Sequence, residues 1–104
     1  MMVINPQVIK KIQKMQEDLK KAQAEINAST FYGQAGGSVV KVTVKGTKEV
    51  LSIEIKKDEV DLNDIEMVQD LIVAALNDAF KKVDRETEET LGSLAQGMKF
   101  PGMF

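Results

Sequence analysis

Two side chains central to much of covalent catalysis and to transition-metal binding, cysteine and histidine, are missing from this sequence. It contains no cysteine and no histidine, so thiolate nucleophiles, imidazole bases and the common zinc ligands are all absent. Two acidic pairs, Asp58 with Glu59 and Asp61 with Asp64, lack the number of ligands and the turn glycine of a calcium loop. We therefore expect no enzyme, no cofactor, no metal site and no small-molecule substrate.

Charged side chains are the remaining groups that could bind a ligand, and they are unevenly distributed along the sequence. The 104 residues have a net charge of −2. Residues 1–57 hold ten basic and five acidic side chains, and residues 58–104 hold four basic and eleven acidic ones, which gives +5 and −7. The lysines of the first half fit either an ordinary solvated surface or a locally basic face that attracts polyanions.

A long helix is predicted at the start of the chain. Apolar residues recur at intervals of four and three from Val8 to Ile26, and Pro6 follows Asn5 at a favourable first helical position. This pattern predicts a helix over residues 6–28. Its narrow apolar seam needs a helical partner of similar length.

A β-hairpin is predicted in the middle of the chain, because apolar residues there alternate with polar ones. Residues 29–37 contain a Thr-Phe-Tyr cluster and three glycines, which predict a further short strand with a bend. A two-stranded sheet is not stable alone, so these strands need the second helix and another chain. We therefore expect a homodimer whose interface is formed by the alternating apolar residues Val40, Val42, Val44, Leu51, Ile53 and Ile55.

A second helix is predicted after a polar connection, with Asn63 and Glu66 forming a capping box at its start. It is apolar over a wide arc as far as Ala79 and then continues as a solvated arm, since neither glycine nor proline interrupts it before Gly92. The fold class is α+β, with one domain over residues 1–96 and a flexible tail over residues 97–104. No apolar run is long enough to cross a membrane, so a cytoplasmic protein without membrane contact is expected.

The order of these elements and four sequence blocks resembles the YbaB/EbfC family of bacterial nucleoid-associated proteins. The blocks are residues 33–37, 40–46, 53–55 and 70–79, and the resemblance covers nearly all of the chain. It implies a homodimer in which the strands associate at the centre and paired helices project like the arms of tweezers. It further implies that double-stranded DNA lies between these arms and that the protein is located in the nucleoid.

Contact with phosphate requires several cations on one surface. Lys10, Lys14 and Lys21 share one flank of the first helix, and Lys81 and Arg85 are one turn apart on the second. Alternatively, Arg85 pairs along its helix with Glu88 or Glu89. Five acids of the second helix are expected to repel phosphate: Asp78, Asp84, Glu86, Glu88 and Glu89.

The sequence thus leaves two functions open. In the first, the dimer binds duplex DNA through these five basic residues, organises the nucleoid and modulates gene expression. In the second, the arms dock another protein, and any contact with DNA is weak or incidental.

Overall fold

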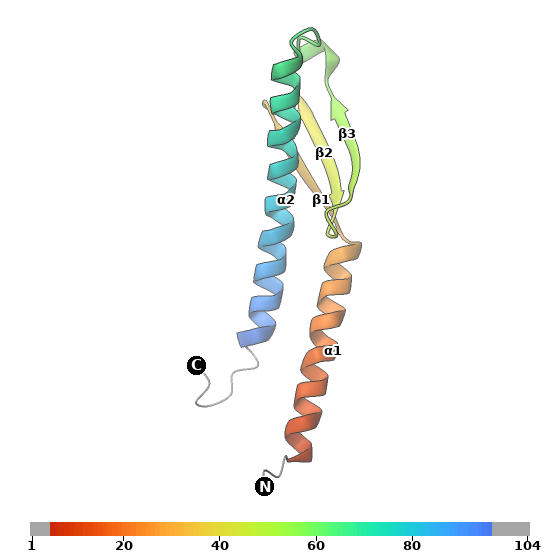
Figure 1. Ribbon diagram of the computed structural model, residues 1–104, viewed down its shortest axis with the longest axis vertical. Helices are drawn as coiled ribbons and strands as arrows, with labels where there is room; N and C mark the ends of the chain where they lie inside the picture. Colours follow the sequence, from red (N-terminus) through yellow and green to blue (C-terminus); the bar gives the residue numbers. More distant parts are fainter. Residues whose placement is uncertain (1–4, 97–104) are drawn as a thin grey trace.

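The computed structural model describes residues 5–96 and confirms the predicted α+β class. Its elements are α1 (Pro6–Ala28), β1 (Thr30–Ala35), β2 (Val40–Lys45), β3 (Val50–Ile55), a short 3-10 helix η1 (Lys57–Glu59) and α2 (Ile65–Gln96). The molecule measures 72 × 24 × 20 Å, with α1 and α2 running in opposite directions along its length and the sheet beside the first half of α2 (Figure 1). The tail expected over residues 97–104 lies outside the described residues.

Helix α1 has the predicted bounds. The Asn5 side chain accepts a hydrogen bond from the Gln7 backbone N–H at 2.9 Å, and Pro6 occupies the first helical position. The apolar seam is buried only near its end, where Ala22 and Ile26 are 9% and 4% exposed, whereas Ile12 is 42% exposed. Helix α1 extends beyond the end of α2 (Figure 1), so α2 covers only part of the seam.

The sheet is antiparallel, in the order β1-β2-β3. The hairpin of β2 and β3 is as predicted, with a bulge between Thr43 and Val44. Strand β1 pairs with β2 along all six of its residues, so it is longer than the short strand expected from the sequence. The turn between β1 and β2 contains Gly36 and Gly37 at φ values of 63° and 68°, which other residue types adopt only with strain.

The core lies between α2 and the first two strands. Val40, Val42 and Val44 of β2 are at most 1% exposed and pack in one cluster with Ala75 and Ala79 of α2. Sequence analysis placed these three valines in a dimer interface. They are instead enclosed within a single chain, because α2 covers them, and they have no surface left for a partner.

Strand β3 is less well covered than β1 and β2. Helix α2 packs on β1 and β2. Ile53 is paired with Val42 across the strands, yet it is 43% exposed, and its neighbours Val50 and Leu51 are 42% and 45% exposed. Ile55 is half-buried and packs against the core, so Val50, Leu51 and Ile53 are the apolar side chains of β3 that remain at the surface of the protomer.

Helix α2 begins one residue later than the capping box predicts. Asp64, not Asn63, caps it, because the Asp64 Oδ1 accepts a hydrogen bond from the Met67 backbone N–H at 3.2 Å. The helix continues past the sheet to Gln96 and contacts α1 there, as the long apolar seam of α1 predicted. Within residues 5–96, neither helix combines the length and the apolar character needed to span a membrane.

Helix α2 approaches β1 very closely at Gly33. A Cβ atom at this position would lie 2.6 Å from the Ala79 backbone nitrogen and 2.8 Å from the Ala79 Cβ, and it would also overlap the Ala75 carbonyl oxygen. These neighbours are backbone or rigid atoms, so a side chain at residue 33 would push α2 away from the sheet. Glycine is therefore required here by close packing.

Substituting Gly33→Ala should lower the free energy of unfolding by about 2–3 kcal/mol, because an added methyl group must displace the helix backbone. The measurement is urea unfolding followed by circular dichroism at fixed protein concentration. Gly92→Ala is the matched control, since Gly92 lies in α2 with no atom within 4 Å of an added Cβ. The control should stabilise by up to about 1 kcal/mol through helix propensity, and equal effects of the two changes would refute the packing argument.

Candidate nucleic-acid interface

Three of the candidate lysines lie on one face of α1. Lys10, Lys14 and Lys21 are all exposed. At 100° per residue they fall within about 40° of one another, about 80–120° from Ala22 and about 120–160° from Ile26, the two buried residues of α1. Neither of the two ion pairs found within residues 5–94 involves these lysines. Their ammonium groups face solvent on the side of α1 that points away from α2.

Lys81 and Arg85 form a second, smaller group on α2. Both are exposed, and they lie on the opposite side of the helix from the buried residues Ala79 and Val83. The alternative in which Arg85 pairs with Glu88 or Glu89 is not found in the structure, since neither ion pair of the described side chains contains Arg85. The guanidinium group is therefore available for an external anion.

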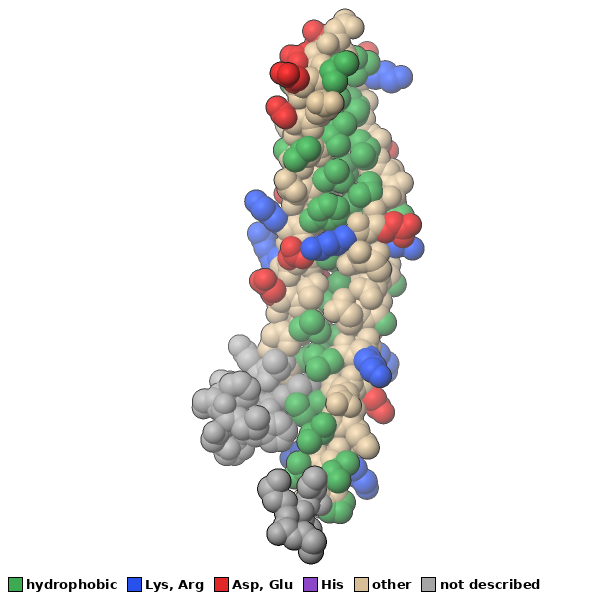
Figure 2. Space-filling model, in the orientation of Figure 1, with side chains coloured by type: hydrophobic (Ala, Val, Ile, Leu, Met, Phe, Trp, Pro, Cys, Tyr) green, Lys and Arg blue, Asp and Glu red, His purple; other side chains and the backbone are tan. Residues whose placement is uncertain are grey.

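The two basic groups do not meet within one protomer. Each faces away from the contact between α1 and α2, so they lie on different sides of the paired helices. In Figure 2, basic side chains project from both flanks of the molecule, with a strip of hydrophobic side chains between them. One protomer consequently presents two separate basic surfaces, and a clamp on a single polyanion needs a further copy.

The first half of α1 is the most uniformly basic part of the two helices. Residues 6–16 contain Lys10, Lys11 and Lys14 and no acidic residue. Lys11 is exposed as well. It is not among the predicted DNA-binding residues, because it does not share the flank of the helix on which Lys10, Lys14 and Lys21 lie. A count of charge along the chain would have included it, because a polyanion responds to local charge density as much as to one helix face.

Two of the acids expected to repel phosphate are paired with lysines. The Lys48 Nζ lies 2.9 Å from the Asp84 Oδ1, and the Lys82 Nζ lies 3.6 Å from the Asp78 Oδ2. Both pairs are solvent-exposed, so they contribute little stability, but they reduce the negative charge around α2. The remaining acids of the described side chains do not gather in groups of three that could hold a metal ion.

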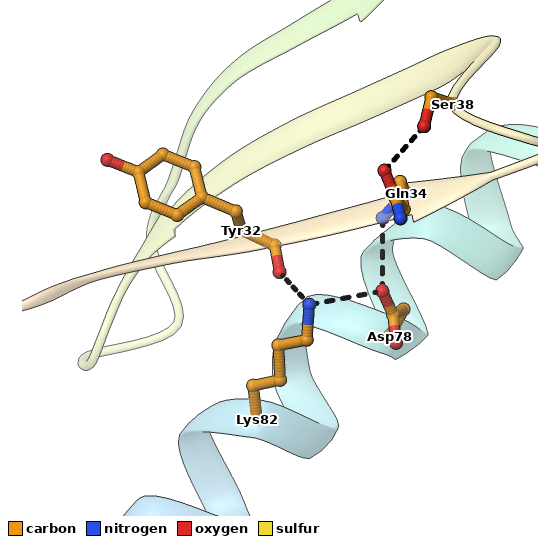
Figure 3. A network of polar contacts seen from close by, with 5 residues as sticks. All are labelled: Tyr32, Gln34, Ser38, Asp78 and Lys82. Carbon is orange, nitrogen blue, oxygen red and sulfur yellow. Dashed lines mark hydrogen bonds and ion pairs between the residues drawn. The ribbon is translucent and has the colours of Figure 1, made fainter.

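Asp78 and Lys82 also close one edge of the sheet, as Figure 3 shows. The Gln34 backbone N–H donates to the Asp78 Oδ2 at 3.1 Å, and the Lys82 Nζ donates to the Tyr32 carbonyl oxygen at 2.8 Å. These backbone groups belong to the outer edge of β1, which otherwise has no neighbouring strand. These contacts could not be predicted from the sequence, because the partners are more than 40 residues apart along the chain.

Exposed lysines that cluster along one helix are typical of proteins that bind polyanions. Comparison with known proteins identifies the family. The profile of the YbaB/EbfC DNA-binding family matches residues 4–98, and the chain belongs to that family.

Named relatives match over most of their length. A nucleoid-associated protein of Clostridium novyi is 46% identical over 93% of this chain and 85% of its own. One from Oceanobacillus iheyensis is 45% identical over 93% of each chain. An uncharacterized protein from Helicobacter pylori has a similar crystal structure, with a TM-score of 0.67 and 25% identity over 93% of this chain and 98% of its own.

Substituting Asp78→Ala should make the Gln34 amide exchange with solvent several-fold faster, because its hydrogen-bond acceptor is removed. The loss of stability should stay within about 1 kcal/mol, since the site is exposed. Hydrogen exchange followed by NMR measures the first effect and urea unfolding the second. Asp84→Ala removes the other ion pair of α2 and should leave the Gln34 amide unchanged; acceleration in both variants would mean that the edge contact is unimportant.

Proposed function

We propose that this protein binds duplex DNA as a homodimer in the nucleoid, with α1 as the main contact. The observation that carries the proposal is the first half of α1, where three exposed lysines occur without an acidic residue. Membership of a DNA-binding family and the names of the relatives support it. A protein that covers stretches of duplex in this way organises the nucleoid and changes the access of other proteins to promoters, which modulates gene expression.

Release of counterions from the phosphate backbone would supply most of the affinity. If each protomer neutralises about three phosphates, a dimer neutralises about six, and the logarithm of the binding constant falls with the logarithm of salt concentration with a slope near −5. A single protomer would give half this slope and a much lower affinity. Electrostatic binding of this kind thus depends on assembly into a dimer.

The uncovered apolar surface beside β3 is the best candidate for the dimer interface. It consists of Val50, Leu51 and Ile53 on β3 together with Val73 of α2, which is 56% exposed. Val73 is on the flank of α2 opposite to Asp78, about 140° away around the helix, and so on the side of β3. Exposed apolar groups that gather on one face, as in the upper half of Figure 2, are typical of surfaces that another chain covers.

The free edge of β3 gives a second reason to expect pairing at this place. Side chains of α2 occupy the edge of β1, whereas no strand or side chain of the described residues bonds to the outer edge of β3. Two copies related by a two-fold axis can pair their β3 strands antiparallel and form one six-stranded sheet. In that dimer, each α2 would approach the uncovered face of both β3 strands.

The change Ile53→Asp should dissociate the dimer, because it places a charge at the centre of the apolar strip. Sedimentation velocity at micromolar concentration should give the mass of the dimer for the wild type and about 11.5 kDa for the variant. Ser52→Asp is the control, since it adds the same charge to the opposite face of β3. A wild-type protein that sediments as a monomer, or an Ile53→Asp variant that stays dimeric, contradicts this interface.

Replacing both Lys10 and Lys14 by glutamine should weaken duplex binding at least about tenfold at low salt and make the salt slope shallower by about 3–4, because four contacts are lost per dimer. Fluorescence anisotropy of a labelled duplex across a salt series measures both quantities. The control is the double change Lys56→Gln and Lys57→Gln, which removes the same charge at the other end of the molecule. Unchanged binding in the α1 variant, or no binding by the wild type at low salt, would reject the proposal.

A second candidate function is supported by the apolar seam of α1. Val8, Ile9 and Ile12 are between 39% and 42% exposed at the end of the helix that carries the free lysines. Apolar residues contribute nothing to phosphate contact, and they suit the docking of another protein. The same duplex titration separates the two functions, since a docking protein would bind duplex weakly and without dependence on Lys10 and Lys14.

A further inference from the structure

The side of the sheet that faces away from α2, here called the outer face, is uncovered and entirely polar. It contains Tyr32, which is the only tyrosine of the chain and is 62% exposed. In Figure 3 the ring of Tyr32 lies on the opposite side of β1 from Asp78 and Lys82, so it does not pack against the helix. An aromatic ring this exposed contributes little to folding and offers a flat surface to a ligand.

A depression of about 420 Å³ lies beside this ring. Its polar lining comes from all three strands and from α2: Tyr32, Gln34, Lys41, Thr43, Glu54 and Lys82. A depression of this volume is in the range that holds small organic groups. It combines one stacking surface with two amide or hydroxyl side chains, two cations and one carboxylate, that of Glu54, which is the cross-strand partner of Lys41.

The cations of the depression differ in how they are held. The Lys82 Nζ is fixed at the rim by the Tyr32 carbonyl oxygen at 2.8 Å and by Asp78. Lys41 forms neither of the two ion pairs of the described side chains, and Lys45 follows it on the same face of β2, about 13 Å along the strand. Lys41 and Lys45 are therefore placed to follow a charged backbone that passes the ring of Tyr32.

From this arrangement we propose that the outer face is a second nucleic-acid site, which takes unpaired bases of single-stranded DNA. A base can stack on Tyr32 only if it has left the duplex, since paired bases are already covered on both faces by their neighbours. Lys41 and Lys45 then contact the adjoining phosphates. This goes beyond duplex binding by α1 and uses a different surface, one that a dimer joined through β3 leaves open.

The absence of tryptophan and of other tyrosines gives a direct probe of this site. Protein labelled with fluorotyrosine has a single fluorine resonance, from residue 32. Addition of an oligothymidine of about ten nucleotides should shift this resonance, whereas a blunt duplex of the same length should leave it in place. Movement with the duplex alone, or no movement while the oligothymidine binds, overturns the proposal.

Affinity measurements with variants complete the test. Tyr32→Ala should weaken oligothymidine binding about tenfold, whereas Tyr32→Phe, which keeps the ring, should bind within about twofold of the wild type. Both should bind duplex normally. The double change of Lys10 and Lys14 to glutamine should weaken duplex binding and leave oligothymidine binding unchanged. Failure of this proposal and failure of duplex binding by α1 are therefore distinguishable. Equal oligothymidine affinity for Tyr32→Ala and wild type, or no binding by the wild type, refutes the second site.

Discussion

The close contact between α2 and β1 at Gly33 decides how the rest of the molecule is arranged. Because the α2 backbone lies directly against Gly33, which has no side chain, α2 is held over β1 and β2 and not over β3. On the same stretch of the helix, Asp78 and Lys82 reach the backbone of β1 and close that edge. The same displacement leaves β3 without a covering helix. One packing constraint thus produces a closed edge and an open one.

The fold also determines which charged side chains are paired and which are free. The chain has more acidic than basic residues, which by itself argues against a polyanion ligand. However, Asp78 and Asp84 are paired with Lys82 and Lys48, and the lysines of α1 keep no such partner among the described side chains. Screening confines electrostatic attraction to about 10 Å, so a ligand responds to the surface it touches more than to the net charge.

The sequence predicts elements well and their contacts less well. The bounds of α1 follow from Asn5, Pro6 and the apolar period, which are local signals. The full length of β1 was underestimated because glycine weakens its strand pattern, although Gly33 is needed for packing against α2. The assignment of Val40, Val42 and Val44 to a dimer interface failed for a related reason. Alternation predicts that one face of β2 is buried but does not identify the covering element.

The arrangement of the basic groups is the reason why the proposed binding of duplex DNA would need a second copy. In one protomer the lysines of α1 and the group around Arg85 face different sides, so one straight duplex cannot touch both. Two copies joined through β3 would present each kind of surface twice, and a duplex between two arms could meet α1 of one copy and α2 of the other. Contacts of this kind involve phosphates and weaken steeply with salt. Binding of a single strand at the outer face would combine stacking on Tyr32 with about two phosphate contacts per protomer, and each such contact has a smaller salt slope than in duplex DNA. Rising ionic strength should therefore shift the preference of the proposed dimer from duplex toward unpaired strands.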